Sequence, residues 1–169
     1  MQLIIVRHAK AKQRDASLWP DDRERPLTKS GRSDFARLAK RLSHWMKPPD
    51  VMLSSTWVRA WETASILCNE TRWPHATRCE LLESEGGDIA LHKLLDMLRS
   101  RATQPSLALV GHEPLLSELI GHLLGGNALI SLAKGAVAWL DINALEGRGT
   151  LRALVPPEAV RRSKARCNL

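Results

Sequence analysis

The stretch QLIIVRHA at residues 2–9 decides the fold, because it places an arginine and a histidine directly after a buried strand. The run from Gln2 to Val6 is short, apolar and rich in β-branched residues, which is the form of a central strand buried on both faces. Arg7 and His8 follow at its carboxyl end. In open α/β sheets, ligands bind in the crevice outside the carboxyl ends of the strands. We therefore expect a ligand site around Arg7 and His8.

The rest of the chain alternates between predicted helices and predicted strands. Four segments repeat apolar residues at helical spacing: 28–46, 56–69, 89–98 and 115–124. Short apolar runs predict strands at 51–53, 77–80 and 107–110, followed by a closing antiparallel pair at 136–142 and 149–155. This alternation is typical of a three-layer α/β/α sandwich with a mostly parallel central sheet. Three tryptophans at helical spacing are predicted to be core residues: Trp45, Trp57 and Trp61.

Two further strand ends deliver side chains of the same kind. Arg59 follows the strand at 51–53, and His112 follows the strand at 107–110 through Gly111. A phosphoryl group in transfer spreads charge over its equatorial oxygens, so two guanidiniums in fork geometry suit its stabilisation. A neutral imidazole can attack phosphorus in line and hold the phosphoryl group until water removes it. Arg7, His8, Arg59 and His112 together therefore indicate phosphoryl transfer.

These residues lie in motifs that resemble the histidine phosphatase superfamily, also called the phosphoglycerate mutase-like family. Within that family the chain is most similar to the short SixA-type phosphohistidine phosphatases. The matching motifs follow the family's order up to about residue 125: Arg7-His8-Ala9, Arg25-Pro26-Leu27-Thr28 with Gly31, Ser54-Ser55 leading to Arg59-Ala60 and Thr63-Ala64, Gly86-Gly87-Asp88, and Gly111-His112-Glu113-Pro114. A single Arg-His-Ala would be weak evidence, whereas the ordered set is specific.

The resemblance implies a phosphoglycerate mutase-like fold and a metal-independent phosphatase, a hydrolase that needs no cofactor. His8 would be the nucleophile that forms a covalent phosphohistidine. Arg7 and Arg59 would bind the phosphate, and His112 would donate to the phosphoryl oxygens. The implied partner is a histidine-phosphorylated protein domain or a phosphorylated small molecule.

The general acid is the point at which the match to the wider family weakens. Relatives that cleave phosphate esters carry an acid in mid-chain, for which Glu83 is the first candidate here and Asp88 the second; both also fit solvated carboxylates. Phosphohistidine has a good leaving group once its ring is protonated, so it depends less on such an acid. The loops in which larger relatives insert a lid are short here, which predicts a pocket open to a protein substrate.

Two classes of alternative stay open. The first keeps the fold and changes the substrate: a small-molecule phosphomonoesterase that uses Glu83 as its acid. The second is a phosphate-binding module without turnover, or a basic nucleic-acid-binding protein. The presence of His8 beside the other three side chains favours an enzyme, because binding alone needs no in-line nucleophile.

Composition predicts one domain over residues 1–160, followed by a basic tail at 161–169. The chain has 169 residues, 44% of them hydrophobic and 25% charged. Four of the positive charges behind the net charge of +7 lie in the tail, and no nucleic-acid-binding motif is present, so nucleic-acid binding is not expected. Three widely spaced cysteines predict neither a disulfide framework nor a metal site. No signal-peptide pattern and no membrane-spanning run is found, so we expect a cytoplasmic protein.

Overall fold

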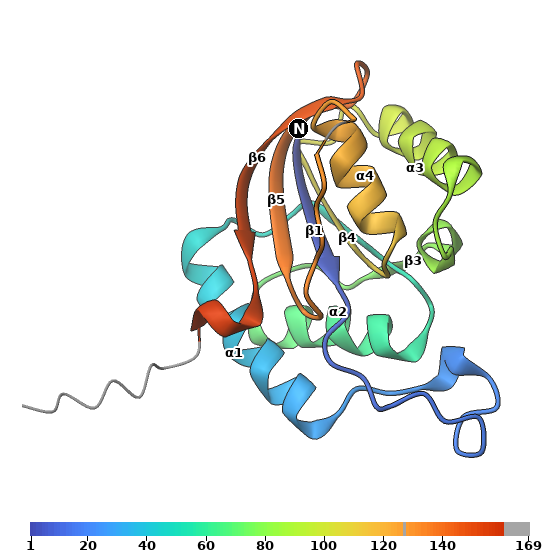
Figure 1. Ribbon diagram of the computed structural model, residues 1–169. Helices are drawn as coiled ribbons and strands as arrows, with labels where there is room; N and C mark the ends of the chain where they lie inside the picture. Colours follow the sequence, from blue (N-terminus) through green and yellow to red (C-terminus); the bar gives the residue numbers. More distant parts are fainter. Residues whose placement is uncertain (127, 161–169) are drawn as a thin grey trace, which may run out of the picture.

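A six-stranded sheet forms the centre of the computed structural model, which describes residues 1–126 and 128–160 (Figure 1). The strand order is β3-β2-β4-β1-β5-β6. The strands are β1 (Gln2–Arg7), β2 (Val51–Ser54), β3 (Thr77–Arg78), β4 (Ser106–Gly111), β5 (Val137–Asn143) and β6 (Arg148–Val155). β1 to β4 pair in parallel, whereas β5 is antiparallel to both β1 and β6. The predicted mostly parallel sheet with a closing antiparallel pair is confirmed.

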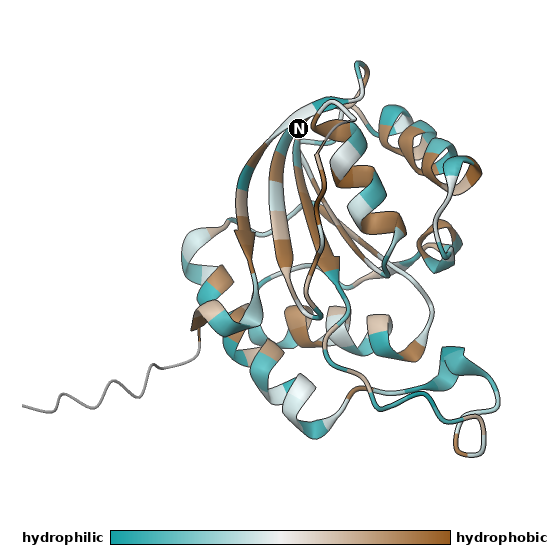
Figure 2. Cartoon of the chain, viewed as in Figure 1, coloured by the Kyte–Doolittle hydropathy of each residue, from teal (hydrophilic) through white to brown (hydrophobic). Residues whose placement is uncertain are grey.

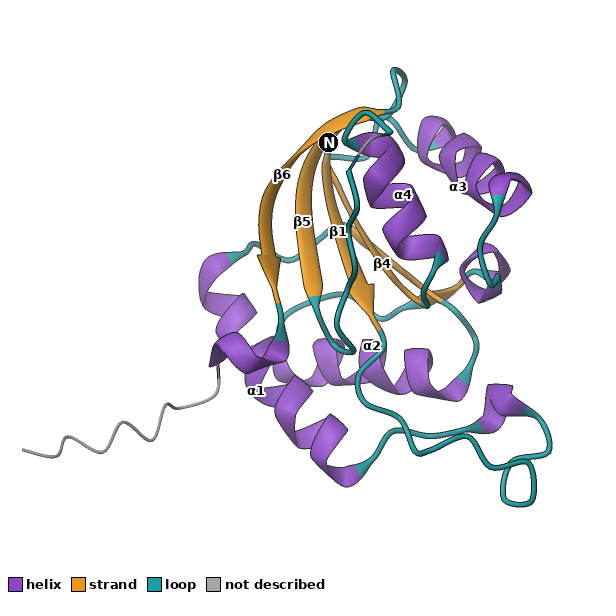
Figure 3. Cartoon of the chain, in the orientation of Figure 1, coloured by secondary structure: helices purple, strands orange, loops and turns teal. Residues whose placement is uncertain are grey.

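Helices cover both faces of the sheet, which confirms the predicted three layers (Figure 3). The helices α1 (Lys29–Trp45) and α2 (Val58–Glu70) pack on one face. On the other face lie α3 (Asp88–Ser100) and α4 (Leu115–Leu123). Three short 3-10 helices complete the described chain: η1 (Asp22–Glu24), η2 (Glu80–Glu83) and η3 (Pro157–Val160).

The central strand β1 contributes to the core on both sides. Leu3 and Ile5 belong to the cluster beneath α3 and α4, and Ile4 and Val6 belong to the cluster beneath α1 and α2. All four are fully buried. Successive side chains in a strand point to opposite faces, so a strand covered on both faces must be apolar throughout. Figure 2 shows this as hydrophobic colour along the inner strands, in contrast to the hydrophilic loop that follows β1.

The start of α1 holds that long loop close to the sheet. Thr28 caps the helix by accepting a hydrogen bond from Gly31 N at 2.9 Å, and Thr28 N donates to Lys10 O at 2.9 Å. A Cβ atom at position 31 would lie 2.2 Å from Lys10 O. Only glycine therefore allows the backbone after His8 to pass this close to the first turn of α1.

The prediction that the three tryptophans are core residues is wrong. Trp45, at the end of α1, is 55% exposed, and Trp57 and Trp61 are only half-buried. The ring of Trp61 lies 5.5 Å from Arg78 Cζ, at the outer edge of the sheet. Trp57 precedes α2 rather than lying on its apolar stripe, so helical spacing does not describe its position.

Smaller differences concern the ends of elements. The strand predicted at 77–80 stops at Arg78, because the chain turns into η2 at Glu80. Within residues 1–126 and 128–160, no helix is long and apolar enough to cross a bilayer. The predicted basic tail at 161–169 lies outside the residues that the structure describes.

Candidate active site

The ends of β1, β2 and β4 bring the predicted site residues together. Arg7 pairs with Gly111 in the register of β1 and β4, so His8 and His112 follow at the same level of the sheet. His8 N donates to Gly111 O at 3.0 Å, and the two imidazole ring centroids lie 5.1 Å apart. Ser55 extends the same edge from β2, because its N–H donates to Val110 O at 2.9 Å. The expected convergence of strand ends is present.

The environment of His8 defines its tautomer and its charge. Its Nδ1 lies 2.7 Å from Ala9 O, and a carbonyl can only accept, so Nδ1 carries the proton and Nε2 keeps a free lone pair. Burial chiefly lowers the pKa of His8 to about 3; the nearby cations Arg59, Arg7 and Arg25 contribute to this shift, and the hydrogen bond to Ala9 O opposes it. His8 is therefore a neutral imidazole at physiological pH, with Nε2 available as a nucleophile.

His112 is the second neutral imidazole of the site. Burial lowers its pKa to about 2, with the neighbouring His8 and Arg59 acting in the same direction. Its Nε2 lies 2.9 Å from Ser55 Oγ, and its buried Nδ1 has no partner among the described residues. Nδ1 is thus the atom of His112 left over for a ligand.

Arg59 occupies the first turn of α2 and is held by Asp22 of η1. Its Nη1 donates to Asp22 O at 2.7 Å, and its Nη2 lies 3.1 Å from Asp22 Oδ2. Burial lowers the pKa of Arg59 to about 10, Arg25 adds to this effect, and Asp22 opposes it. The guanidinium remains charged at neutral pH. The Asp22 carboxylate occupies the position on the guanidinium where an anionic ligand would bind.

Arg7 brings the second predicted guanidinium from the end of β1. Its Nη1 donates to Leu132 O at 2.5 Å, which ties it to the segment before β5. Burial lowers the pKa of Arg7, an effect that Glu113 opposes. With His8, Arg59 and His112, it completes the set of four that the strand-end pattern predicts.

Several buried nitrogen atoms in this cluster lack a partner among the described residues. Arg7 Nε, Arg59 Nε and His112 Nδ1 are all buried and make no hydrogen bond to any described residue. Buried donors in proteins are normally paired, so each such group calls for an explanation. An oxyanion with several acceptor oxygens would satisfy them. The site is thus suited to binding a phosphoryl group.

Three contributors were not predicted as site residues. Asp22 accepts from Arg25 Nε at 2.7 Å and from Arg25 Nη2 at 3.2 Å, and this contact chiefly holds the pKa of Asp22 below its usual range. Trp57 packs its ring against both Arg59 and His112. A sequence signal existed for Arg25, which lies in the Arg25-Pro26-Leu27-Thr28 motif, but none marked Asp22 in its polar loop.

Thr63, which belongs to one of the family motifs, bridges two parts of the site. Its fully buried hydroxyl accepts from Ala9 N at 3.0 Å and donates to Arg59 O at 2.7 Å. The turn that carries His8 is thereby joined to the helix that carries Arg59. A hydroxyl is required here, because it must accept on one side and donate on the other.

The candidate acids occupy different surroundings. Glu83 ends η2, and its Oε1 accepts from Thr56 Oγ1 at 2.5 Å, one residue beyond Ser55. Asp88 is exposed as the first residue of α3, and no hydrogen bond between described residues joins its side chain to the site. Glu113, which follows His112, was not predicted as an acid; burial raises the pKa of its carboxyl. Glu83 and Glu113 are therefore the carboxylates tied to the site's own segments.

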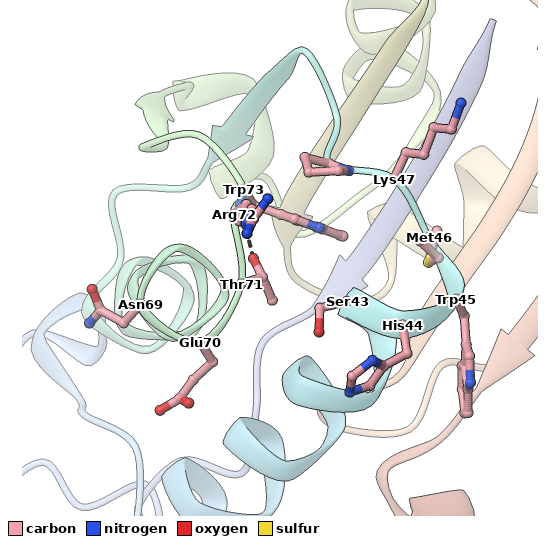
Figure 4. A pocket seen from close by; sticks show the side chains of 11 residues that line it. Ser43, His44, Trp45, Met46, Lys47, Asn69, Glu70, Thr71, Arg72 and Trp73 are labelled. Atoms are coloured by element: carbon pink, nitrogen blue, oxygen red, sulfur yellow. Dashed lines mark hydrogen bonds between the residues drawn. The ribbon is translucent and has the colours of Figure 1, made fainter.

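The expected open pocket differs from what the structure shows. His8 is 6% exposed, and Arg59 and His112 are each 4% exposed, because Asp22, Ser55 and Trp57 pack around them. A cavity of about 730 Å³ lies elsewhere, between the carboxyl ends of α1 and α2, and holds none of the predicted site residues (Figure 4). Among the described residues, no cluster of His, Cys, Asp and Glu could hold a metal ion.

Solved structures of phosphatases share this fold. The protein histidine phosphatase SixA complexed with tungstate matches with a TM-score of 0.84 and 24% identity, over 95% of this chain and 100% of that one. The α-ribazole phosphatase from Shigella flexneri matches with a TM-score of 0.73 and 19% identity, over 93% and 97% of the two chains. The predicted phosphoglycerate mutase-like fold is confirmed.

Sequence comparisons give the family. An uncharacterised protein of Picosynechococcus is 32% identical over 118 residues, which is 70% of each chain. The family model of the histidine phosphatase superfamily (branch 1) matches residues 3–94, which carry Arg7, His8 and Arg59. The chain is therefore a phosphatase of the histidine phosphatase superfamily, in its branch 1.

Proposed function

We propose that this protein is a phosphohistidine phosphatase that removes the phosphoryl group from a phosphoprotein through a covalent intermediate on His8. The observation that carries the proposal is the hydrogen bond between His8 Nδ1 and Ala9 O, which leaves Nε2 unprotonated. Burial keeps the ring neutral, so no deprotonation has to precede attack. A histidine that served only to bind phosphate would be better as a charged donor.

In the first step, His8 Nε2 attacks phosphorus as the bond from phosphorus to the substrate nitrogen breaks. The leaving imidazole keeps the electron pair of that bond and is neutral if its other nitrogen already carries a proton. Arg7 and Arg59 bind the equatorial oxygens, and His112 Nδ1 donates to one of them. Arg59 must exchange its contact with Asp22 for the phosphoryl oxygens. Water then attacks phosphorus and its protons stay on the phosphate, while the bond from phosphorus to His8 Nε2 breaks and its electron pair returns to Nε2.

A phosphoprotein substrate is favoured by the chemistry of its leaving group. The phosphoramidate bond needs little help from a positioned acid, and neither Glu83 nor Asp88 is hydrogen-bonded to His8 among the described residues. The fold is that of SixA, described as a protein histidine phosphatase. A histidine-phosphorylated domain is the proposed partner, and a cytoplasmic location stays a prediction.

The test compares wild type, His8→Ala and a matched control, His44→Ala, whose histidine is exposed on α1. Each protein is mixed with a phosphohistidine-bearing domain and, separately, with p-nitrophenyl phosphate. We expect wild type and the control to release phosphate faster from the domain than from p-nitrophenyl phosphate. An acid-labile adduct should be detected by intact-protein mass spectrometry. Phosphate release that persists in His8→Ala would contradict the proposed nucleophile.

A small-molecule phosphomonoesterase is the second candidate, favoured by the placement of two carboxyls beside the site. Glu83 is tied to the segment that carries Ser55, and Glu113 follows His112 with a raised pKa. An ester needs a proton for its alkoxide leaving group. Selective loss of ester hydrolysis in Glu83→Gln or Glu113→Gln would identify the acid. Hydrolysis of p-nitrophenyl phosphate that exceeds phosphohistidine hydrolysis would make this candidate the better account.

A further inference from the structure

The ring of Trp57 contacts both groups that would hold the phosphoryl oxygens. Arg59 Cζ lies 4.5 Å from the centroid of the Trp57 ring. The ring centroids of Trp57 and His112 lie 4.6 Å apart, with an interplanar angle of 45°. The indole Nε1 is buried and has no partner among the described residues. Trp57 therefore contacts this site through its ring, without a hydrogen bond from its N–H.

The backbone of Trp57 is joined to the same two groups. Its N–H donates to Ser55 Oγ at 3.2 Å, and Ser55 Oγ lies 2.9 Å from His112 Nε2. Its carbonyl accepts from Ala60 N at 2.9 Å, in the first turn of α2, the turn that carries Arg59. The position of the ring is thus set from both sides, by the Ser55 segment and by the start of α2.

We propose that Trp57 is a positioning residue that holds the Arg59 guanidinium and the His112 imidazole in the orientation required by the phosphoryl group in flight. This inference rests on the proposed phosphatase function. An aromatic face attracts a guanidinium, and more strongly where water is excluded. When Arg59 exchanges its contact with Asp22 for a ligand, the ring holds the guanidinium in place while the η1 loop moves away. Catalytic groups need this kind of support from residues packed behind them.

The experiment compares Trp57→Leu and Trp57→Phe with the control Trp61→Leu. Trp61 lies on α2, the helix that Trp57 precedes, and its ring contacts Arg78. With p-nitrophenyl phosphate, kcat of Trp57→Leu should fall about thirtyfold, which corresponds to about 2 kcal/mol. KM should change less than about threefold, because orientation matters most in the transition state. Trp57→Phe keeps an aromatic face and should recover most of kcat, and Trp61→Leu should match wild type.

Inhibition by orthovanadate separates positioning from general damage to the fold. Vanadate adopts the five-coordinate geometry of the transition state, so its inhibition should weaken in parallel with kcat, and inhibition by inorganic phosphate should weaken less. Unchanged kcat and vanadate inhibition in Trp57→Leu would overturn the inference. Equal impairment of Trp57→Phe and Trp57→Leu would overturn it too.

A measurement on wild type covers the case in which Trp57→Leu does not fold. The indole N–H resonance of Trp57, assigned with Trp57→Phe, should shift when vanadate is added, and that of Trp61 should not. A Trp57 resonance that does not shift on addition of vanadate would contradict the proposed contact. If wild type hydrolysed neither substrate, the proposed function would fail. Vanadate binding measured by this resonance would still test whether Trp57 contacts the groups that bind the anion.

Discussion

Lowering the pH from 7.5 to 5.5 should destabilise this protein, because two imidazoles are buried in the neutral form. The pKa of His8 is lowered to about 3 and that of His112 to about 2, chiefly by burial. In the unfolded chain both return to about 6.5. The unfolded state therefore binds more protons below pH 6.5, so the contribution to stability is complete above 6.5 and is lost as the pH falls.

The size of the effect follows from these pKa values. Each imidazole lowers the free energy of unfolding by about 1.4 kcal/mol per pH unit below 6.5, so both together cost roughly 3 kcal/mol at pH 5.5. The carboxyl of Glu113, whose pKa burial raises, acts in the opposite direction. Asp22, whose pKa is lowered, titrates below this window. The imidazoles should therefore dominate between pH 7.5 and pH 5.5.

Urea unfolding at pH 7.5, 6.5 and 5.5 in phosphate-free buffer measures the effect. His112→Asn should lose about half of the pH dependence, and a double variant with His8→Asn should lose nearly all of it. The exposed His44 supplies the control, since His44→Asn should behave as wild type. The double variant could lose as much unfolding free energy between pH 7.5 and pH 5.5 as wild type does. That result would refute the argument that both rings are buried and neutral.

Three further substitutions test contacts around the site. Thr63→Val removes the acceptor for Ala9 N and should lower the free energy of unfolding by about 1–3 kcal/mol in urea, whereas Thr63→Ser should not; equal stability of the two would count against the bridge. Asp22→Asn removes a carboxylate that competes with phosphate for Arg59, so competitive inhibition by inorganic phosphate should strengthen several-fold; weaker inhibition would show that Asp22 assists binding. Gly31→Ala places a Cβ against a backbone carbonyl oxygen and should lower the unfolding free energy by about 1–3 kcal/mol; an unchanged thermal midpoint would contradict that contact.

Most of the fold could be predicted because its signals are local. The apolar run of β1 and the helical repeats between strands each follow from burial on two faces or on one. Arg7, His8 and His112 could be placed because they directly follow strands whose ends meet at one edge. The structure pairs Arg7 with Gly111, the residue before His112, so these strand ends do meet.

The missing residues depend on contacts between distant segments. Asp22 belongs to a polar loop, and its pairing with Arg59 across 37 positions leaves no periodic pattern in the sequence. Trp57 was placed in the core because its spacing fits the stripe of α2, yet the helix begins at Val58. One residue before a helix, the direction of a side chain is set by the cap and not by the 3.6-residue repeat. The helical spacing was therefore extended one residue beyond the start of the helix.

A buried group of positive charges is unfavourable when no ligand is present, and the chain reduces this cost in two ways. It keeps His8 and His112 neutral, and it supplies Asp22 as a counter-ion for Arg59 and Arg25. Because η1 contains no buried residue, moving the carboxylate away from Arg59 disturbs little packing. A contact that stabilises the free protein can then give way to a phosphoryl group, since the incoming dianion satisfies the same guanidinium. The polar loop after His8 is therefore as much a part of the proposed chemistry as the strand ends themselves.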